Sequence, residues 1–523
     1  MSRDAKRQRR TASSIGVNAL EDRLVLSQVI QGVDIDGDQW FLRLVGPGTI
    51  RVVNQPNGSG DPVPLGTPAL IQSIEIAGTA SLTSRLIGEV KKADGGDGRV
   101  YFQQMNQFGG NSLAGTSNNG LYAVDIPDFW LGITTTATTA QTASISIDNG
   151  VNTLRFGGAD FTVSPGGGLP APASNTLADS VVIQLGMPAY LGTSIFVNKF
   201  VTDTKAGSTA GTLVQDSVLV EVIGRINAFQ ASEIGGTSTQ PSTGFVGGGG
   251  TVVKSSGEYL GEAIQTAIVG AIGEVMIKGN ATNFGVQSGT SIRRLNIGGE
   301  TRSIFALATS GIRYGQFGLG MDDVTIHTHT MSRLEANRGA IGSEVKVTRQ
   351  LGYFRTGGDV IDSLIQSGLQ QDLTSEFRQQ RVTSSDTPAD LGGAIHALIG
   401  GSVVDSIFAA SFEPYNSEFD SPYAMALTAG KIEAKVTGTI DNSNVTPAQP
   451  NKAFYAQNVE QSRGPVTPPA APSIPADSPA KFTKTPSGNF VVLGRPFPSN
   501  KKISSKFALP NVTEFLKRTN PIL

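Results

Sequence analysis

The stretch of sequence that decides the fold occurs twice, as GGDVIDSLI at residues 357–365 and as GGSVVDSIF at residues 400–408. The two copies align without gaps, and a looser copy, GGETRSIF at residues 298–305, is one residue shorter. Each copy joins two glycines, which suit a sharp corner, to an apolar pair expected to point inward. The Asp-Ser or Arg-Ser step that follows is expected to turn the chain again. This repeated corner predicts a chain that coils through equivalent positions.

A second regularity extends the pattern. Successive pieces, each with short alternating apolar runs separated by turn residues, begin near Ile272, Ile292, Ile312, Arg333 and Tyr353. Their spacing of about twenty residues is the length of one β-solenoid turn, which cannot bury its inward side chains unless it stacks on its neighbours. Residues 272 to about 460 are therefore predicted to form one right-handed parallel β-helix, with a loop or helical excursion at residues 370–391.

The composition agrees with strands joined by tight turns. Charged residues make up 16% of the 523-residue chain, against roughly 25% in a typical soluble domain, and its 64 glycines exceed the roughly 7% expected. Upstream of the repeats, residues 40–45 and 49–53 are predicted to form a hairpin around Gly46-Pro47-Gly48. Helical spacing is limited to residues 257–272 and a segment near Asn511. The predicted fold class is all-β: a right-handed parallel β-helix (solenoid) preceded by a smaller β-rich region, with one or two short helices.

Changes in composition divide the chain into parts. Gly, Ser and Thr gather in one stretch and Pro and Ala in another, as is typical of linkers. The predicted parts are a basic amino-terminal sorting segment (1–27), a β-rich domain (28–132), a strand region leading toward the solenoid (133–234), a Gly/Ser/Thr-rich linker (235–256), the β-helix with a short helix at its start (257–464), a Pro/Ala-rich linker (465–481) and a carboxy-terminal tail or cap (482–523).

The amino terminus differs from the rest of the chain. A basic cluster at residues 6–10 is followed, after a polar spacer, by Leu20-Glu21-Asp22-Arg23-Leu24-Val25-Leu26-Ser27. Charges interrupt the apolar stretch that a secretory signal needs, so the residues alone indicate a basic tail leading into a first helix or strand. The run resembles the LEPR-XLL signature near the amino terminus of many planctomycete proteins, with Asp22 in place of the usual Pro and Val25 in place of Leu. The resemblance implies a sorting motif read by export machinery, in a long repetitive protein that is exported or surface-attached.

Charge and cysteine content exclude several classes of function. The formal net charge of −2 provides no overall field that recruits nucleic acid or anionic lipid. The chain has no cysteine, which excludes disulfides, thiolate nucleophiles and cysteine-ligated metals. Gly270, Gly273 and Glu274 interrupt the most apolar stretch, so no transmembrane span is expected.

Carboxylates provide the main case for an enzyme, because parallel β-helices include polysaccharide lyases and glycosidases. Hydrolysis of that kind needs two carboxylates facing one cleft at a defined separation. Asp322 and Asp323 are the candidate pair, with Asp359 as a third. Adjacent strand residues face opposite sides, so only one of the pair can face a given groove. A solvated turn is the preferred interpretation, and no catalytic residue is assigned.

Histidines give a second, weaker signal. His327 and His329 are two positions apart, so on a strand they would share a face and could begin a metal site. A further ligand would have to come from a neighbouring turn, where Glu344 is the candidate. The third histidine of the chain is His396. We assign no metal site to these residues.

Asp34, Asp36 and Asp38 alternate as calcium ligands often do. An EF-hand loop would need a Gly after the third acid and a Glu later, and Gln39-Trp40 breaks that pattern. A turn entering the first strand is the preferred interpretation, with weak Ca²⁺ binding as the alternative and no other cofactor expected. Lys254, which follows a run of four glycines, lacks the preceding Gly and the strand-to-helix context of a phosphate loop.

Together these features favour a non-catalytic structural or adhesive protein of the bacterial cell surface or extracellular matrix. Its expected partners are polysaccharide or other cell-envelope components, and export machinery through residues 20–27. The alternative is a β-helix carbohydrate-active enzyme, a polysaccharide lyase or glycoside hydrolase. A cleft with clustered Asp, Lys, Arg or aromatic residues on several successive turns would favour the enzyme, and in the sequence such residues look scattered.

Overall fold

The computed structural model describes most of the chain between residues 27 and 493. The described residues are 27–55, 62–80, 83–108, 120–132, 140–162, 178–186, 192–206, 213–236, 250–256, 270–368, 393–413, 425–426, 430–446, 449–470, 481–484 and 490–493. Every regular element among them is a strand, which confirms the all-β prediction. They contain no helix, and hence none long and apolar enough to cross a membrane. The helix predicted at 257–272 lies outside the described residues except for 270–272, which are not helical: Ile272 forms parallel bridges to Ile226 and Ile292. The loop or helical excursion predicted at 370–391 and the helix predicted near Asn511 also lie outside the described residues.

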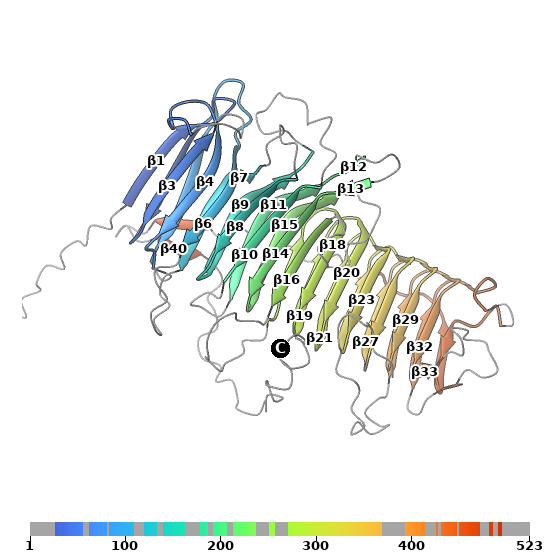
Figure 1. The fold of residues 1–523 in the computed structure, drawn as a ribbon. Coiled ribbons are helices and arrows are strands. Elements are labelled where there is room, and N and C mark those ends of the chain that lie inside the picture. The colour runs from blue at the N-terminus through green and yellow to red at the C-terminus, as the bar shows by residue number, and fades with distance from the viewer. Residues whose placement is uncertain are drawn as a thin grey trace, which may run out of the picture.

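One long ladder of hydrogen-bonded strands forms the first side of an elongated stack (Figure 1). It begins with two antiparallel pairings and is parallel from β5 onward. Its strands, in spatial order, are β1 (Ser27–Val33), β2 (Gln39–Val45), β5 (Arg85–Lys91), β7 (Leu121–Leu131), β9 (Val151–Asp160), β11 (Thr193–Thr202), β15 (Ile226–Gly236), β17 (Val275–Ile277), β19 (Ser291–Ile297), β21 (Gly311–Phe317), β24 (Met331–Ala336), β27 (Leu351–Thr356), β30 (Ala394–Ile399), β35 (Lys431–Val436) and β38 (Asn458–Arg463).

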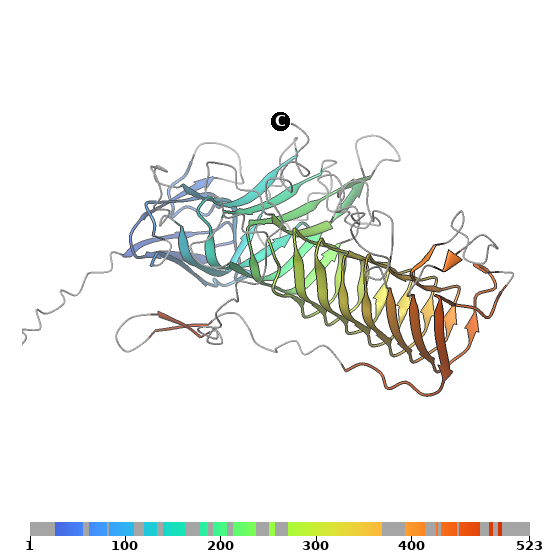
Figure 2. The same cartoon turned by 90° about the horizontal axis from the view of Figure 1, so that it is seen from below.

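A second ladder forms the opposite side, and it is parallel after its first pair. Its strands are β3 (Thr49–Gln55), β4 (Leu70–Ala77), β6 (Val100–Phe108), β8 (Thr142–Ile147), β10 (Ser180–Leu185), β14 (Ser217–Ile223), β16 (Gly250–Ser256), β18 (Ala281–Ser288), β20 (Thr301–Ala308), β23 (Val324–Thr328), β26 (Glu344–Val347), β29 (Leu364–Ser367), β32 (Ile407–Ala410) and β37 (Phe454–Tyr455). Figure 2 shows the turns that connect the two ladders stacked along one axis.

Short strands at one corner form a third parallel ladder. They are β22 (Met321–Asp322), β25 (Ala340–Ile341), β28 (Val360–Ile361), β31 (Val403–Val404) and β36 (Ile440–Asp441). Three antiparallel pairs complete the described strands: β12 (Thr204–Ala206) with β13 (Leu213–Gln215), β33 (Phe412–Glu413) with β34 (Met425–Ala426), and β39 (Lys481–Lys484) with β40 (Phe490–Leu493).

The length of chain between equivalent positions separates two regions. In the long-turn region, residues 27–256, Ile145 pairs with Ile183, so that one turn there takes roughly forty residues. In the compact region, residues 275–368, Val275 pairs with Leu295, and each later turn likewise takes about twenty residues. The predicted spacing is therefore confirmed. After residue 368 the turns lengthen again, and Ile365 pairs with Phe408.

The repeated Gly-Gly motif makes a corner, as predicted. A Cβ on Gly358 would overlap the carbonyl oxygen of Arg338, and one on Gly401 would overlap the preceding turn, so glycine is required where successive turns approach closely. One residue per turn adopts a left-handed backbone, with φ between 47° and 57°: Asn283 and Ser303 within β18 and β20, then Asp323, Gly342, Asp362 and Asp405, each directly after a corner strand. The predicted Asp turn is thus a column of left-handed residues.

Buried serines then continue the corner. The backbone N–H of Ser343 donates to Ser363 Oγ over 3.2 Å, and the N–H of Ser363 donates to Ser406 Oγ over 3.0 Å. Each hydroxyl donates to the carbonyl two residues earlier, so these interior polar atoms are satisfied. Asn442 Oδ1 ends the series by accepting from the Ser406 N–H at 3.0 Å.

One hydrophobic core runs through the stack, from Trp40 in β2 to Phe454 in β37. Within it, phenylalanines on successive turns contact one another. The ring centroids of Phe200 and Phe229 are 6.5 Å apart, and those of Phe229 and Phe284 are 6.3 Å apart. Stacking identical side chains this way buries apolar surface that a single turn would leave exposed.

Three expectations need correction. The hairpin around Gly46-Pro47-Gly48 is wrong, because β2 pairs with β1 and β5 while β3 pairs with β4; these glycines carry the chain from one ladder to the other. The end of the expected linker at 235–256 is strand β16, which pairs on both sides. The apolar pair of the corner does not point inward as a unit: Val360 is fully buried but Ile361 is partly exposed, because neighbouring strand residues face opposite sides.

Candidate binding face and carboxylate cluster

The first ladder has an unusual backbone in the compact region. In β19 the inward side chains Ile292 and Leu295 are three positions apart instead of two, so two adjacent residues between them point outward. Strands β21, β24 and β27 repeat this arrangement. Strand β30 lacks the extra residue, and the register shifts where it meets β27. The extra outward residue is present in all four strands, which stay in register, and it doubles the number of side chains that they present to solvent.

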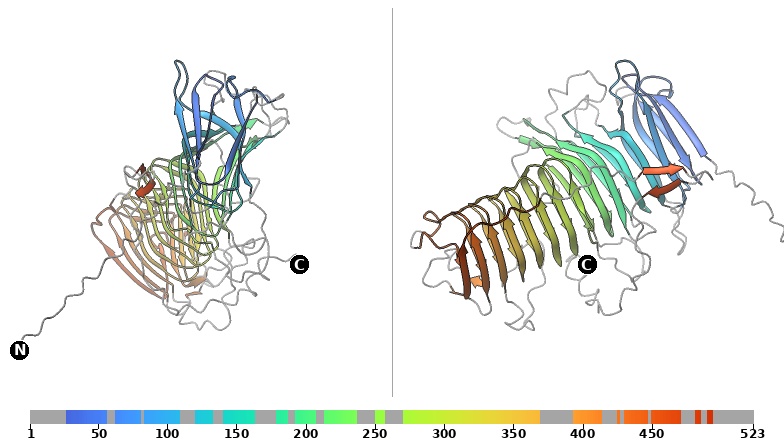
Figure 3. Two further views of the ribbon diagram at one scale, coloured as in Figure 1. Left: turned by 90° about the vertical axis from the view of Figure 1, so that its left-hand side faces the viewer. Right: turned by 180° about the vertical axis from the view of Figure 1, so that it is seen from behind.

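The outward positions of these four strands carry arginine and tyrosine. We call six of them the arginine–tyrosine strip: Arg293, Arg294, Arg313, Tyr314, Arg333 and Tyr353. Register places Arg294 beside Tyr314 and Tyr314 beside Arg333 on neighbouring strands. In Figure 3 these strands lie side by side along the stack. The strip therefore runs parallel to the axis of the molecule.

Contacts within the strip hold the guanidinium groups over aromatic rings. The guanidinium carbon of Arg313 is 5.1 Å from the ring centroid of Tyr314, and that of Arg333 is 5.3 Å from the ring centroid of Tyr353. The ring of Tyr353 also stacks on that of His396: the two rings are nearly parallel, and their centroids are 5.5 Å apart. Cation–π contacts of this kind fix an arginine without neutralising its charge.

Acidic partners balance part of the strip. Arg294 pairs with Glu274 at 3.0 Å, and Arg333 pairs at 2.6 Å with Glu335, which is 2% exposed. Arg293 and Arg313 are exposed and have no carboxylate partner among the described residues. The strip thus combines two unpaired cations with two paired ones, on a chain whose net charge is −2.

Residues 464–470, which follow β38, run along the outside of the stack (Figure 2). The guanidinium of Arg355 donates through Nε to the carbonyl oxygen of Thr467 at 2.7 Å and through NH2 to that of Pro468 at 2.9 Å. This segment falls in the expected Pro/Ala-rich linker, and it covers Arg355 while leaving the neighbouring Tyr353 partly exposed.

Reading residues one by one along the sequence missed the strip. Its members look scattered in the sequence because about one turn of chain separates neighbouring strands of the strip. Two of them, Arg333 and Tyr353, are nevertheless residues at which the repeated pieces were taken to begin. The structure places those two in the strip, whereas Ile272, Ile292 and Ile312 belong to an inward column that continues to Met331. Applying the repeat period to polar and aromatic positions, and not only to apolar ones, would have found it.

A carboxylate cluster lies at the amino-terminal end of the stack. Ligand atoms of Asp34, Asp36 and Asp38 lie within 4.8 Å of one another. Asp34 Oδ1 accepts the backbone N–H of Asp38 at 2.8 Å, and Asp38 accepts the N–H groups of Ala93 and Gly98, both at 2.6 Å. The predicted turn is present, and its carboxylates also bind it to a second loop.

Burial sets the electrostatics of this cluster. Asp34 is 3% exposed and Asp38 fully buried. Burial, together with a hydrogen bond to Asp36 and the charge of that residue, raises the pKa of Asp34 to about 8. Burial also raises the pKa of Asp97, which donates its N–H to Asp36 Oδ2 at 3.0 Å. Asp36 Oδ1 is buried without a hydrogen-bond partner. The cluster therefore has an oxygen available to a cation.

Two of the histidines, His327 and His396, contact glutamates on neighbouring turns. His327 Nε2 lies 2.7 Å from Glu344 Oε1, the residue predicted to approach it, and Lys346 lies 2.8 Å from the other carboxylate oxygen. The hydrogen bond from His327 and the Lys346 contact lower the pKa of Glu344 to about 2. His329 lies one residue beyond the end of β23. In the described part of the chain, the Asp34 cluster is the one group with metal-ligand spacing, and it contains no histidine.

Asp322, Asp323 and Asp359 do not converge. Asp323 has φ +52° and accepts a hydrogen bond from Ser303 at 2.6 Å, while Asp359 accepts the backbone N–H of Ser402 at 2.6 Å. Both serve the corner between turns. Asp322 is exposed on β22.

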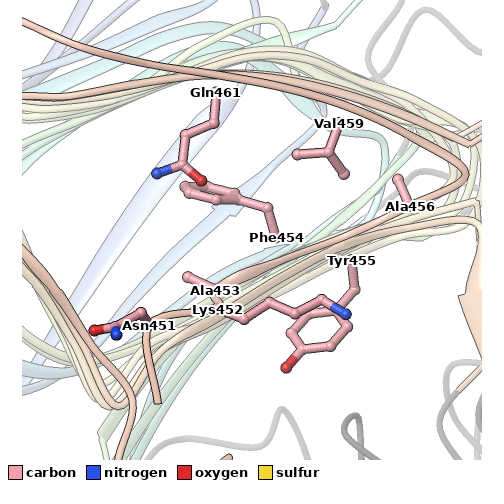
Figure 4. A pocket seen from close by; sticks show the side chains of 8 residues that line it. All are labelled: Asn451, Lys452, Ala453, Phe454, Tyr455, Ala456, Val459 and Gln461. Carbon is pink, nitrogen blue, oxygen red and sulfur yellow. The ribbon is translucent and has the colours of Figure 1, made fainter. Parts of the chain in front are cut away.

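A small pocket of about 270 Å³ opens near the last turns (Figure 4). Its polar side chains are Asn451, Lys452, Tyr455 and Gln461, and no carboxylate or histidine lines it. Tyr455 and Phe454 form its apolar wall. Lys452 Nζ lies 4.5 Å from the ring centroid of Tyr455 within this lining.

The expected Ca²⁺ ligands thus come together, while residues 20–26 of the expected sorting motif lie outside the described residues and Ser27 begins β1. Comparison of the chain with protein-family models, with curated proteins and with solved structures gives no match.

Proposed function

We propose that the chain is a right-handed parallel β-helix that serves as a non-catalytic structural or adhesive protein at the bacterial cell surface or in the extracellular matrix. Right-handedness is supported by the strong preference of parallel crossover connections for that hand, about 98%. The observation that carries the functional proposal is the arginine–tyrosine strip. It is a flat, repeated surface on a rigid stack, and it faces no cleft containing a carboxylate pair among the described residues.

The alternative, a carbohydrate-active enzyme on the same fold, makes a different demand on the site. It requires two carboxylates across a groove from each other. The carboxylate nearest the strip, Glu335, is buried; its Oε1 is paired with Arg333, and Arg355 approaches the same oxygen at 3.8 Å. A buried carboxylate that contacts two guanidiniums fits a structural role and not the transfer of a proton to a substrate.

The test incubates the purified full chain with pectic, alginate-like and glycosaminoglycan polymers. We expect polymer binding without new reducing ends and without the ultraviolet absorbance of unsaturated products. Product formation by the protein, lost on Glu335→Gln, would replace the proposal by the enzyme alternative. Fractionation of cells into cytosol, envelope and medium tests location, and wholly cytosolic protein that retains residues 1–27 would contradict the surface role.

We also propose that Asp34, Asp36 and Asp38 bind Ca²⁺ weakly, since Ca²⁺ prefers carboxylate oxygens and Asp36 Oδ1 has no other partner. Calorimetric titration with CaCl2 should give binding heat that Asp36→Asn removes. Asp94→Asn, an exposed carboxylate on the neighbouring loop, is the matched control and should leave the heat unchanged. Equal titrations for wild type and Asp36→Asn would contradict the site.

A further inference from the structure

We propose that the arginine–tyrosine strip binds a linear acidic polysaccharide laid along the axis of the stack. This inference rests on the proposed surface function and names its ligand. The strip crosses four neighbouring strands, which at the usual strand spacing corresponds to about 14 Å between the first and last. A ligand that follows it must be extended and must carry groups that repeat along its length.

The charge of the strip selects an anionic ligand. Arg293 and Arg313 are exposed on adjacent turns and have no carboxylate partner among the described residues. A guanidinium presents a planar fork of donors that matches carboxylate and sulfate oxygens, and such charge-assisted pairs are the stronger hydrogen bonds. The overall net charge of −2 means that this attraction is local to the strip.

The rigidity of the strip suits repeated binding. Arg313 lies over Tyr314, and Arg333 is held both by the ring of Tyr353 and by Glu335. The bulged strands beneath them belong to a continuously packed core. Arginines that are already positioned lose less conformational entropy on binding, which favours a ligand that contacts several of them at once.

The use of the aromatic rings distinguishes a glycan from a single-stranded nucleic acid. Nucleic acids without sequence preference are held by stacking bases on free aromatic faces beside a basic groove. The two faces of Tyr353 are occupied by Arg333 and His396. Tyr353 therefore offers no open stacking platform, and Tyr314 supports the guanidinium of Arg313, so a charged glycan fits better than a polynucleotide.

The experiment uses the full chain and measures binding of polygalacturonate by calorimetry at low and high ionic strength. Wild type is expected to bind polygalacturonate, to lose affinity in high salt, and to bind the fully methyl-esterified polymer poorly. The double variant Arg293→Gln/Arg313→Gln should weaken binding by about tenfold or more. The matched control, Arg302→Gln/Arg338→Gln, removes the same charge at exposed positions outside the strip and should bind as wild type does.

A sulfated dextran arm distinguishes sulfate from carboxylate as the preferred anion, and preference for either supports an acidic glycan. The proposal would be overturned if both double variants lost the same affinity for polygalacturonate, or if wild type bound the methyl-esterified polymer as tightly as polygalacturonate. Tighter binding of single-stranded DNA than of both glycans would assign the strip to nucleic acid instead. These outcomes are independent of the proposed function, which fails on product formation or cytosolic location while the strip can still bind.

Discussion

The long-turn region and the compact region build the same stack with different lengths of chain. Equivalent positions are separated by roughly forty residues at β8, β10 and β14, but by about half that length of chain from β17 to β29. Both contribute to one continuous core, and the phenylalanine stack of the long-turn region continues into the compact region through Phe229 and Phe284. What differs is the corner: the column of left-handed residues begins at Asn283 and the third ladder at β22. The core is common to both regions, whereas the corner begins in the compact region and continues to Asp405 and β36, where the turns are long again.

The largest expected effect tests whether the two regions share that core. Phe354 is fully buried in the compact region, and its ring centroid is 5.5 Å from that of Phe408. Phe354→Ala should therefore lower the free energy of unfolding by about 3–5 kcal/mol. Both tryptophans, Trp40 and Trp130, lie in the long-turn region, so fluorescence reports that region while far-ultraviolet circular dichroism reports all strands. Denaturant midpoints from the two probes should fall together. A fall in dichroism alone would show two separate units, and exposed Ser332→Ala should change neither.

The next effect concerns the corner, which among the described residues begins in the compact region. Gly358→Ala places a Cβ against the carbonyl oxygen of Arg338, where the backbone of the neighbouring turn cannot move freely. We expect a loss of about 2 kcal/mol or more in the free energy of unfolding. Gly66→Ala in the long-turn region has open space around the added methyl group and should be neutral. Equal denaturation midpoints for the two variants would contradict the close approach of turns.

A smaller effect should come from the left-handed column. Asp362 has φ +47°, and Asp362→Gly relieves the strain of a non-glycine residue there. Glycine also makes the unfolded chain more flexible, so we expect a net gain of roughly 0.5 kcal/mol. Gly342 occupies the equivalent position one turn earlier, with φ +57° and open space, so Gly342→Asp should have the opposite sign. If urea denaturation showed that both substitutions change the free energy of unfolding in the same direction, the role assigned to the column would be refuted.

The smallest expected effect is a dependence on pH. The pKa of Glu344 is lowered from 4.5 to about 2, mainly by His327, so its contribution to stability is present above pH 4.5 and is lost as the pH falls through about 2. The pair is partly exposed, and Glu344→Gln should slightly flatten the acid side of the stability curve. Glu300→Gln, an exposed acid nearby, should leave that curve unchanged. Identical curves for wild type and Glu344→Gln would show that the ion pair is not formed in solution.

Much of the compact region could be predicted because its repeat is short and has few insertions. The repeat period, the Gly-Gly corner and the Asp-Ser step all follow from local chemistry that each turn repeats. The long-turn region could not be found this way. Buried and more exposed residues alternate along its strands, as they do in the compact region. Long connections between the strands that carry Ile145, Ile183 and Val220 nevertheless hide the repeat period. A hairpin at Gly46–Gly48 was a reasonable local prediction, and tertiary pairing overrode it.

The candidate sites show the same contrast. Asp34, Asp36 and Asp38 are close in sequence, and their clustering could be predicted. The approach of Glu344 to His327 needed the neighbouring turn and was also foreseen. The arginine–tyrosine strip was not, because it depends on an extra residue in four strands that brings Arg293 and Arg294 to the same side. Alternation alone would place such neighbours on opposite sides of a strand.

The most direct test of a stack built from equivalent turns removes one turn of the compact region. Deleting residues 321–339 joins Gly320 to Ala340, the register partner of Met321, so the next turn should take the place of the missing one. Deleting residues 321–330 removes only half a turn and leaves β21 without its connection to the corner. Far-ultraviolet circular dichroism with urea denaturation should show a β-rich, cooperatively unfolding protein for the first deletion and loss of cooperative unfolding for the second. Loss of structure in both deletions, or its retention in both, would contradict a stack of interchangeable turns.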